Sequence, residues 1–139
     1  MKTIKLPFIV KKPVLACGAD LKAAFALARG REAYLYDGFG DLADADNIGR
    51  YERAVNGAIR NHRIAPKIII CDMHPGYFSA RFAEEFLRCT KSAVLRRIQH
   101  HEAHIAAAVV DNCIRGDVIG VAFDGTGYEK LWSSYGIAV

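Results

Sequence analysis

Three histidines lie within five residues, and their spacing favours metal binding. His100, His101 and His104 belong to the segment QHHEAH, in a chain of 139 residues with only five histidines. If the segment is helical, His100 and His104 lie one turn apart on the same face, so two imidazoles can reach one metal ion. The alternative is that they are solvated polar side chains at a helix start. The clustering favours the metal.

The same segment excludes a zinc-protease site. The protease motif HExxH requires a second histidine three residues after the glutamate. After His101 and Glu102 that position is Ile105, and His104 follows the glutamate one residue too soon. Glu102 is therefore not placed as the general base of that class of enzyme.

A glycine-rich turn follows the last apolar run of the chain. It consists of Asp124, Gly125, Thr126 and Gly127. Glycines let a backbone approach phosphate oxygens, backbone amides and the threonine hydroxyl can donate to them, and an aspartate can hold a metal ion. On pattern alone such a stretch is more often just a tight turn. It is not a Walker P-loop, because no Gly-Lys-Ser/Thr follows.

A third candidate segment is DMHPGY, which contains His74 and follows the strongest predicted strand. Loops at the carboxyl ends of strands build ligand sites in α/β proteins. His74 before Pro75 is equally typical of a rigid turn that starts a helix, and both interpretations stay open. Asp20 lies in a similar loop with fewer arguments in its favour.

The hydrophobic pattern predicts the elements that must position these residues. Strands are expected near residues 14–18, 22–28, 31–36, 67–71, 93–98 and 117–123, and helices from Asp44 or Asp46 to about 61, over 77–89 and over 100–112. Residues 28–31 are expected to form a hairpin turn. The continuous β-branched run Ile68–Ile70 predicts a strand buried on both faces, inside one mixed sheet.

This order predicts an α/β fold of a specific type. A three-stranded meander followed by alternating helices and strands matches a ribonuclease-H-like lobe of the actin-like ATPase fold. Residues 1–116 would form this lobe, and residues 117–139 would begin a truncated second lobe as a strand hairpin. We expect that hairpin to pack onto the first lobe or to pair with another copy, because an isolated hairpin is marginal in water.

Composition excludes several classes of protein. The net charge of +4 is mild and the basic residues are scattered, so nucleic acid is not an expected partner. No apolar stretch reaches the roughly 20 residues of a membrane span, and no signal peptide is visible. The four cysteines have no CxxC pairing, which argues against a zinc ribbon and for reduced thiols. A cytoplasmic protein is expected.

The segments DMHPGYFS, QHHEAH and FDGTGY, in this order, resemble the HypF family of carbamoyltransferases that act in hydrogenase maturation. Further matching stretches are residues 13–30 (PVLACGADLKAAFALARG) and 38–42 (GFGDL). The catalytic domain of that family is shared with the tRNA threonylcarbamoyl-transferases. The three segments together are far more specific than any one of them.

The resemblance implies a function and a site. It implies transfer of a carbamoyl group from ATP-derived carbamoyl-adenylate to a hydrogenase-maturation carrier protein. His100, His104 and Asp124 would be metal ligands, and Gly125–Gly127 would face the phosphate. His101 and His74 would lie beside the site. The expected metal is zinc or iron(II), about one ion per copy, released below roughly pH 6, where histidine protonates.

The sequence departs from the family after Tyr128, where EKLWSSY replaces the usual glycine-containing stretch. We therefore expect the lone chain to be incomplete as an enzyme, needing another copy or a separate chain for the second lobe. The alternative is a non-catalytic metal-binding or docking module, or a remnant, of the same family.

Overall fold

The computed structural model describes residues 1–90, 92–123 and 137–138. A four-stranded mixed sheet forms its centre, made of β1 (Lys2–Cys17), β2 (Phe25–Tyr36), β3 (Ile68–Asp72) and β4 (Val94–Ile98) in the spatial order β2-β1-β3-β4. β3 is parallel to both of its neighbours, and β1 and β2 are antiparallel. β3 is thus internal, as its run of isoleucines predicted.

β2 folds back on itself, so its two halves behave as two strands. Twelve extended residues would span roughly 40 Å, yet the rings of Phe25 and Tyr36, its first and last residues, stack with centroids 4.8 Å apart. Gly30 lies at the bend with a φ of +63°, which suits glycine. Residues 25–28 pair with the end of β1, and residues 32–35 pair with its beginning. The chain thus bends within the predicted turn, but the structure has one continuous strand, β2, where two separate strands were predicted.

Two boundaries in this region were predicted wrongly. The strand expected from residue 22 starts at Phe25, because Lys22 has a φ of +50° and the Ala23 N–H donates to the Gly40 carbonyl at 2.8 Å instead of to a strand. At the N-terminus, β1 begins already at Lys2, where no strand was predicted. That extension pairs with the second half of β2 and wraps around the bend at Gly30.

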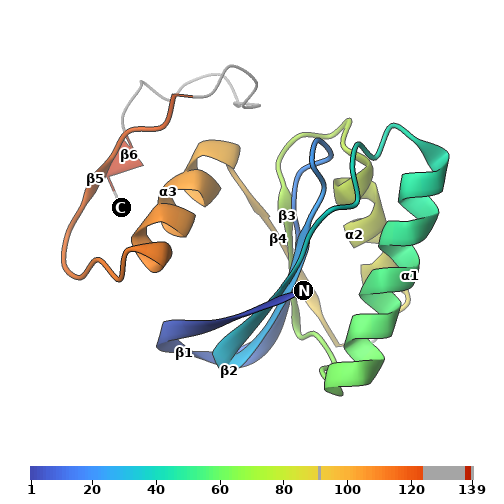
Figure 1. The fold of residues 1–139 in the computed structure, drawn as a ribbon, viewed down its shortest axis with the longest axis horizontal. Coiled ribbons are helices and arrows are strands. Elements are labelled where there is room, and N and C mark those ends of the chain that lie inside the picture. The colour runs from blue at the N-terminus through green and yellow to red at the C-terminus, as the bar shows by residue number, and fades with distance from the viewer. Residues whose placement is uncertain (91, 124–136, 139) are drawn as a thin grey trace.

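Three helices flank the sheet, each within two residues of its predicted range. They are α1 (Ala45–His62), α2 (Phe78–Arg88) and α3 (His100–Asp111). The Asp44 carboxylate caps α1 by accepting from the Asp46 N–H at 2.8 Å. Figure 1 shows α1 and α2 on one side of the sheet and α3 on the other.

The core lies between the sheet and the pair α1 and α2. Both of the helices and the sheet contribute fully buried side chains to it, among them Leu15, Phe25, Leu27, Tyr51, Val55, Ile69 and Ala83. The rings of Phe25, Phe39 and Tyr51 meet one another with centroids 5.5–5.6 Å apart. This cluster fixes α1 on the sheet and leaves the loops at the carboxyl ends of β1 and β3 next to each other.

The last predicted strand is much shorter than expected. β5 covers only Ile119–Gly120 and pairs antiparallel with β6 (Ile137–Ala138) as a separate two-stranded sheet. The apolar run of residues 117–123 predicted a buried strand, but Ile119 is 88% exposed and Phe123 is 96% exposed. An apolar run predicts burial, but it does not show which other part of the structure would pack against it. In the described residues, only β6 pairs with this segment.

β5 packs onto α3 through a close approach at Gly120. A Cβ added at Gly120 would lie 2.5 Å from Cγ2 of Ile105, so only glycine fits there without displacing the isoleucine. Ile105 is also the buried residue of α3. The division of the chain into units at residue 116 stays a prediction.

Candidate metal centre

The N-terminus of α3 brings two imidazoles together. The Gln99 side-chain oxygen caps the helix by accepting from the Glu102 N–H at 3.0 Å, so the helix starts at His100. One turn later His104 lies on the same face. The two rings have centroids 4.8 Å apart at an interplanar angle of 78°, and their Nε2 atoms are 3.1 Å apart. The helical spacing predicted from the sequence thus places two imidazole nitrogens side by side.

A buried carboxylate lies behind the first of these histidines. Asp72 is 7% exposed, and its Oδ2 is 2.8 Å from Nδ1 of His100. Because a carboxylate accepts, the imidazole must donate from Nδ1, and in a neutral ring Nε2 is then unprotonated. This is the arrangement found behind metal-bound histidines, where a carboxylate fixes both the tautomer and the ring orientation.

Parallel pairing explains why Asp72 and His100 meet. Asp72 is the last residue of β3, and its register partner is Ile98, the last residue of β4. The carboxyl ends of the two parallel strands lie at the same edge of the sheet, and α3 begins two residues after Ile98. The loop after β3 was predicted as a candidate site, but this role of Asp72 was not. Asp72 and His100 are 28 residues apart, and only the parallel pairing of β3 with β4 brings them together.

The distance between the two Nε2 atoms fits a shared metal ion. With Zn–N bonds of about 2.0–2.1 Å and tetrahedral angles, two ligand nitrogens are separated by roughly 3.3 Å. The observed 3.1 Å agrees with that value and also with a direct N–H···N hydrogen bond. The carboxylate on Nδ1 of His100 favours the metal arrangement. Within the described residues, no group of three His, Cys, Asp or Glu side chains forms a complete site.

The remaining predicted ligands lie elsewhere in the chain. Asp124 and the predicted phosphate-binding residues Gly125, Thr126 and Gly127 lie outside the described residues. His104, however, also lines an apolar groove of about 580 Å³ between α3 and residues 118–123. The segment that leads to Asp124 therefore borders the same face of α3 as His104.

His101 has a different environment from its neighbours. Its Nδ1 is 2.8 Å from Nε2 of Gln99, and its ring is nearly perpendicular to that of His100, with centroids 6.1 Å apart. Its hydrogen bond therefore goes to the residue that caps α3. This geometry separates His101 from the pair formed by His100 and His104.

His74 builds the turn that leads into α2. Its ring stacks on Tyr77 with centroids 4.3 Å apart, and its Nδ1 accepts from the Gly76 N–H at 3.1 Å. Its backbone N–H donates to Oδ1 of Asp72 at 2.8 Å. His74 therefore takes part in the turn that starts α2, and its role beside the site stays a prediction. His74 is linked to the histidine pair through its backbone and Asp72.

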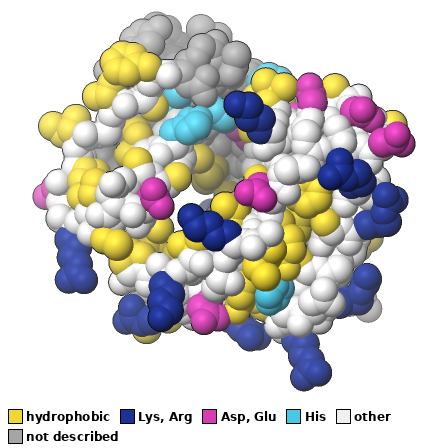
Figure 2. All heavy atoms as spheres, in the orientation of Figure 1, with side chains coloured by type: hydrophobic (Ala, Val, Ile, Leu, Met, Phe, Trp, Pro, Cys, Tyr) yellow, Lys and Arg dark blue, Asp and Glu magenta, His cyan; other side chains and the backbone are white. Residues whose placement is uncertain are grey.

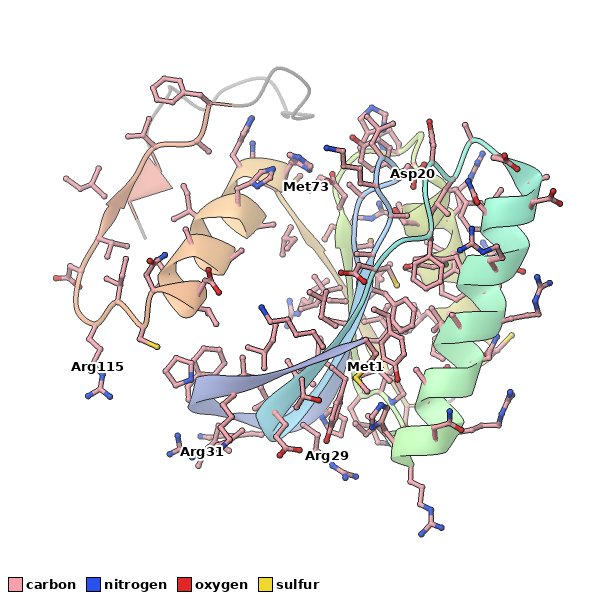
Figure 3. The ribbon with its side chains drawn as sticks, in the orientation of Figure 1. Met1, Asp20, Arg29, Arg31, Met73 and Arg115 are labelled. Carbon is pink, nitrogen blue, oxygen red and sulfur yellow. The ribbon has the colours of Figure 1, made fainter. Side chains whose placement is uncertain are left out.

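Asp20 is a second residue whose role was underrated. Its two carboxylate oxygens accept from the N–H groups of Phe78 and Ser79 at 2.6 and 3.0 Å, so it caps α2 from the β1–β2 loop. Figure 3 shows Asp20 and Met73, the residue after Asp72, at the same end of the molecule. Because Asp20 and Phe78 are 58 residues apart, no local pattern could have predicted this cap.

The cysteines nearest the site are core residues. Cys17 and Cys71 are register partners on β1 and β3, both are buried, and both are free thiols. Burial raises the pKa of the Cys17 thiol to about 12, and burial is also the largest cause that raises the pKa of the Cys71 thiol. Both thiols therefore belong to the core between the sheet and the helices α1 and α2.

Comparisons with known proteins agree on one family. The profile of the HypF Kae1-like domain matches residues 10–111. Carbamoyltransferase HypF of Rhizobium leguminosarum bv. viciae is 38% identical over 124 residues, and that of Synechocystis sp. is 34% identical over 126 residues. The matches cover 88% and 90% of this chain, but the chain spans only 16% of the length of either relative.

Two solved structures share the fold. A crystal structure of full-length HypF in the phosphate- and nucleotide-bound form superposes with a TM-score of 0.82 at 31% identity, and that of HypF from T. kodakarensis with 0.78 at 30%. Each match covers 91% of this chain and 16% of the other. The predicted fold class is confirmed. In the described part of the chain, no helix is long and apolar enough to span a membrane.

Proposed function

This chain belongs to the HypF family through its HypF Kae1-like domain, and we propose that it carries one half of a metal centre that serves carbamoyl transfer in hydrogenase maturation. The observation that carries the proposal is the pair of Nε2 atoms of His100 and His104, 3.1 Å apart, with the carboxylate of Asp72 on Nδ1 of His100. A merely solvated pair of histidines does not require a buried carboxylate.

His100 and His104 would hold the ion, and Asp124 would complete the part of the site that this chain supplies. Three protein ligands leave a position for water or substrate, which is typical of catalytic zinc. When bound, zinc or iron(II) supplies a Lewis acid that polarises a carbonyl or phosphate oxygen. Asp72 would orient His100 and keep Nε2 unprotonated. His74 would help to hold Asp72 through its backbone N–H.

The proposed substrate is carbamoyl-adenylate, and the proposed acceptor is a cysteine of a hydrogenase-maturation carrier protein. The glycine turn Gly125–Gly127, with Thr126, would donate to the phosphate of the adenylate. One solved relative binds phosphate and nucleotide, which supports an adenylate as ligand of the family. The chain spans 16% of the length of this relative, and we propose that the remaining catalytic groups come from outside these 139 residues, for example from a second chain or another copy.

Two measurements test this function. First, the metal content of the purified chain is determined by mass spectrometry before and after loading with zinc or iron(II); about one ion per copy is expected. Second, the loaded chain is mixed with carbamoyl-adenylate and AMP release is followed, with the His104→Ala variant as control. Release above that of the control supports an enzyme. A chain that binds no metal after loading contradicts the proposal.

A second candidate is a metal-binding or docking module without catalysis. The observation in its favour is that the described residues contain no group of three ligands. Metal binding together with AMP release equal to that of the His104→Ala control would assign the chain to this class.

A further inference from the structure

Six exposed cations gather at the end of the sheet opposite to the metal centre. We call them the basic rim: Lys11, Lys12, Arg29, Arg31, Arg63 and Lys67. Figure 3 shows Arg29 and Arg31 at one end of the molecule, with Asp20 and Met73 at the other. The basic rim therefore belongs to a different surface from the histidine pair.

Strand pairing brings these residues together from distant parts of the sequence. The Lys67 N–H donates to the carbonyl of Pro13 at 2.8 Å, which places Lys67 beside Lys12. Ala28 pairs with Val14, so Arg29 follows at the same end of the sheet. The Arg29 guanidinium donates to the Arg63 carbonyl at 3.3 Å.

The charge of the basic rim is not balanced within the described residues. None of its six members forms an ion pair there. The acid on the same hairpin, Glu32, accepts a hydrogen bond from the Tyr34 hydroxyl. β1 and β2 together hold six Lys or Arg and one acid, a net +5, which exceeds the +4 of the whole chain.

Acidic side chains collect elsewhere. Four exposed aspartates lie in the loop after β2 and at the start of α1: Asp37, Asp41, Asp44 and Asp46. Figure 2 shows most Lys and Arg side chains along the lower edge of the view and a group of acidic ones at the upper right. Clustered like charges repel one another and destabilise a compact chain. An anionic partner bound at the basic rim would reduce this repulsion.

Exposed apolar side chains adjoin the basic rim. Phe8 is 49% and Ile9 is 58% exposed, and they precede Val10, which pairs with Gly30 at the bend of β2 next to Arg31. We propose that the basic rim, with Phe8 and Ile9, docks an acidic segment of a partner protein that carries apolar side chains among its carboxylates. This surface lies beyond the metal centre and does not depend on the proposed function.

The chemistry favours a protein segment over a long polyanion. A nucleic acid is longer than the basic rim, so most of its phosphates would have no cation to contact. The small net charge of the chain also attracts a polyanion only weakly at long range. The apolar pair needs apolar partners, which a peptide offers. Arg29 is already held by the Arg63 carbonyl, so less side-chain freedom is lost when a carboxylate binds.

The test uses a fluorescein-labelled twelve-residue peptide of alternating Glu and Leu residues and the full chain, read by fluorescence anisotropy. The double variant Arg29→Glu/Arg31→Glu is expected to weaken binding at least tenfold. The matched control Arg53→Glu/Arg81→Glu, with the same change of charge on exposed helix positions, should weaken it less than threefold. Raising the salt from 50 to 500 mM should abolish binding to the unmodified chain. Phe8→Ser should weaken it without changing the salt dependence.

Circular dichroism and thermal unfolding check that every variant is folded. If the double variant unfolds, the neutral variant Lys12→Gln/Arg31→Gln replaces it, with the same expected direction and at least a threefold loss. Equal losses in the rim and control variants would overturn the proposal. So would tighter binding of a single-stranded RNA oligonucleotide or of anionic lipid vesicles than of the peptide. The proposal would also be overturned if the unmodified chain associated with itself in a salt-sensitive way and the rim variant did not. The surface would then be an interface with a second copy.

Discussion

The environment of a histidine decides what it can do chemically. His100, His101 and His104 are nearly adjacent in sequence, yet His100 meets a buried carboxylate, His104 meets the Nε2 atom of His100, and His101 meets the cap of α3. Within the described residues, the Nε2 atoms of His100 and His104 lie 3.1 Å apart. The three residues should therefore respond differently to the same substitution.

Replacing His100 or His104 by alanine should abolish binding of zinc, because each removes one of the two converging nitrogens. His101→Ala should weaken binding less than threefold, since the ring of His101 bonds to Gln99 instead. Titration calorimetry with zinc at pH 7.5 measures all three variants. If His101→Ala proves as damaging as His104→Ala, the assignment of ligands is wrong.

Asp72→Asn should weaken zinc binding by about 10- to 100-fold, the usual cost of losing the carboxylate behind a metal-bound histidine. The amide can replace the shape of the side chain but not its charge. Calorimetry gives the affinity, and the control is Asp37→Asn, at an exposed aspartate in the loop after β2. An unchanged affinity in Asp72→Asn would show that the carboxylate only supports the turn at His74.

At the scale of elements, the site depends on how α2 and α3 begin. Each helix starts directly after the carboxyl end of a parallel strand or its loop, and each is capped by a side chain: α3 by Gln99, and α2 by Asp20 from another part of the chain. The cap on α2 ties the β1–β2 loop to the helix that follows Asp72 and its loop. Stability of this edge should therefore depend on Asp20.

Asp20→Ala should destabilise the protein by about 1–2 kcal/mol, because two N–H groups at the first turn of α2 lose their acceptor. Urea unfolding followed by circular dichroism measures the difference in the free energy of unfolding. Asp37→Ala, an exposed aspartate outside any helix, should change that energy by less than about 0.5 kcal/mol. Equal effects of the two substitutions would contradict the role given to the cap.

At the scale of the whole molecule, the core contains groups that resist ionisation. Cys17, Cys71 and Tyr51 lie between the sheet and α1 and α2. Burial raises the pKa of Cys17 from 9.0 to about 12, and burial likewise is the main cause that raises the pKa values of Cys71 and Tyr51. In the unfolded chain these groups regain their ordinary values, which links folding to alkaline pH.

The free energy of unfolding should fall as the pH rises above 9. Between pH 9 and about 12 the native chain keeps the proton of Cys17 that the unfolded chain has lost, so each unit of pH costs up to about 1.4 kcal/mol per retained proton. Below pH 9 this contribution is fully present. Urea unfolding at pH 8, 9, 10 and 11 measures the slope.

The variant Cys17→Ala should show a smaller slope, while Cys89→Ala, which removes an exposed thiol, should keep the slope of the unmodified chain. Identical slopes in both variants would exclude Cys17 as the group that titrates. The comparison of slopes is independent of the stability that each substitution itself removes at pH 8.

The sequence alone determined what depends on neighbours along the chain. The helices, the isoleucine strand and the spacing of His100 and His104 follow from periodicity and local caps, and the segments DMHPGYFS, QHHEAH and FDGTGY indicated the family. The extent of β5 escaped this reasoning, because an apolar run such as residues 117–123 does not reveal what surface covers it.

Tertiary structure alone decided the contacts between residues distant in the sequence. Asp72 reaches His100 because β3 and β4 are parallel and end at one edge, Asp20 reaches α2 across 58 residues, and the basic rim forms where strand ends meet. Such contacts depend on strand order and register, which are set by the packing of the whole core. The chemistry of a side chain determines which contacts it can make, and the tertiary structure determines which residues come close enough to make them.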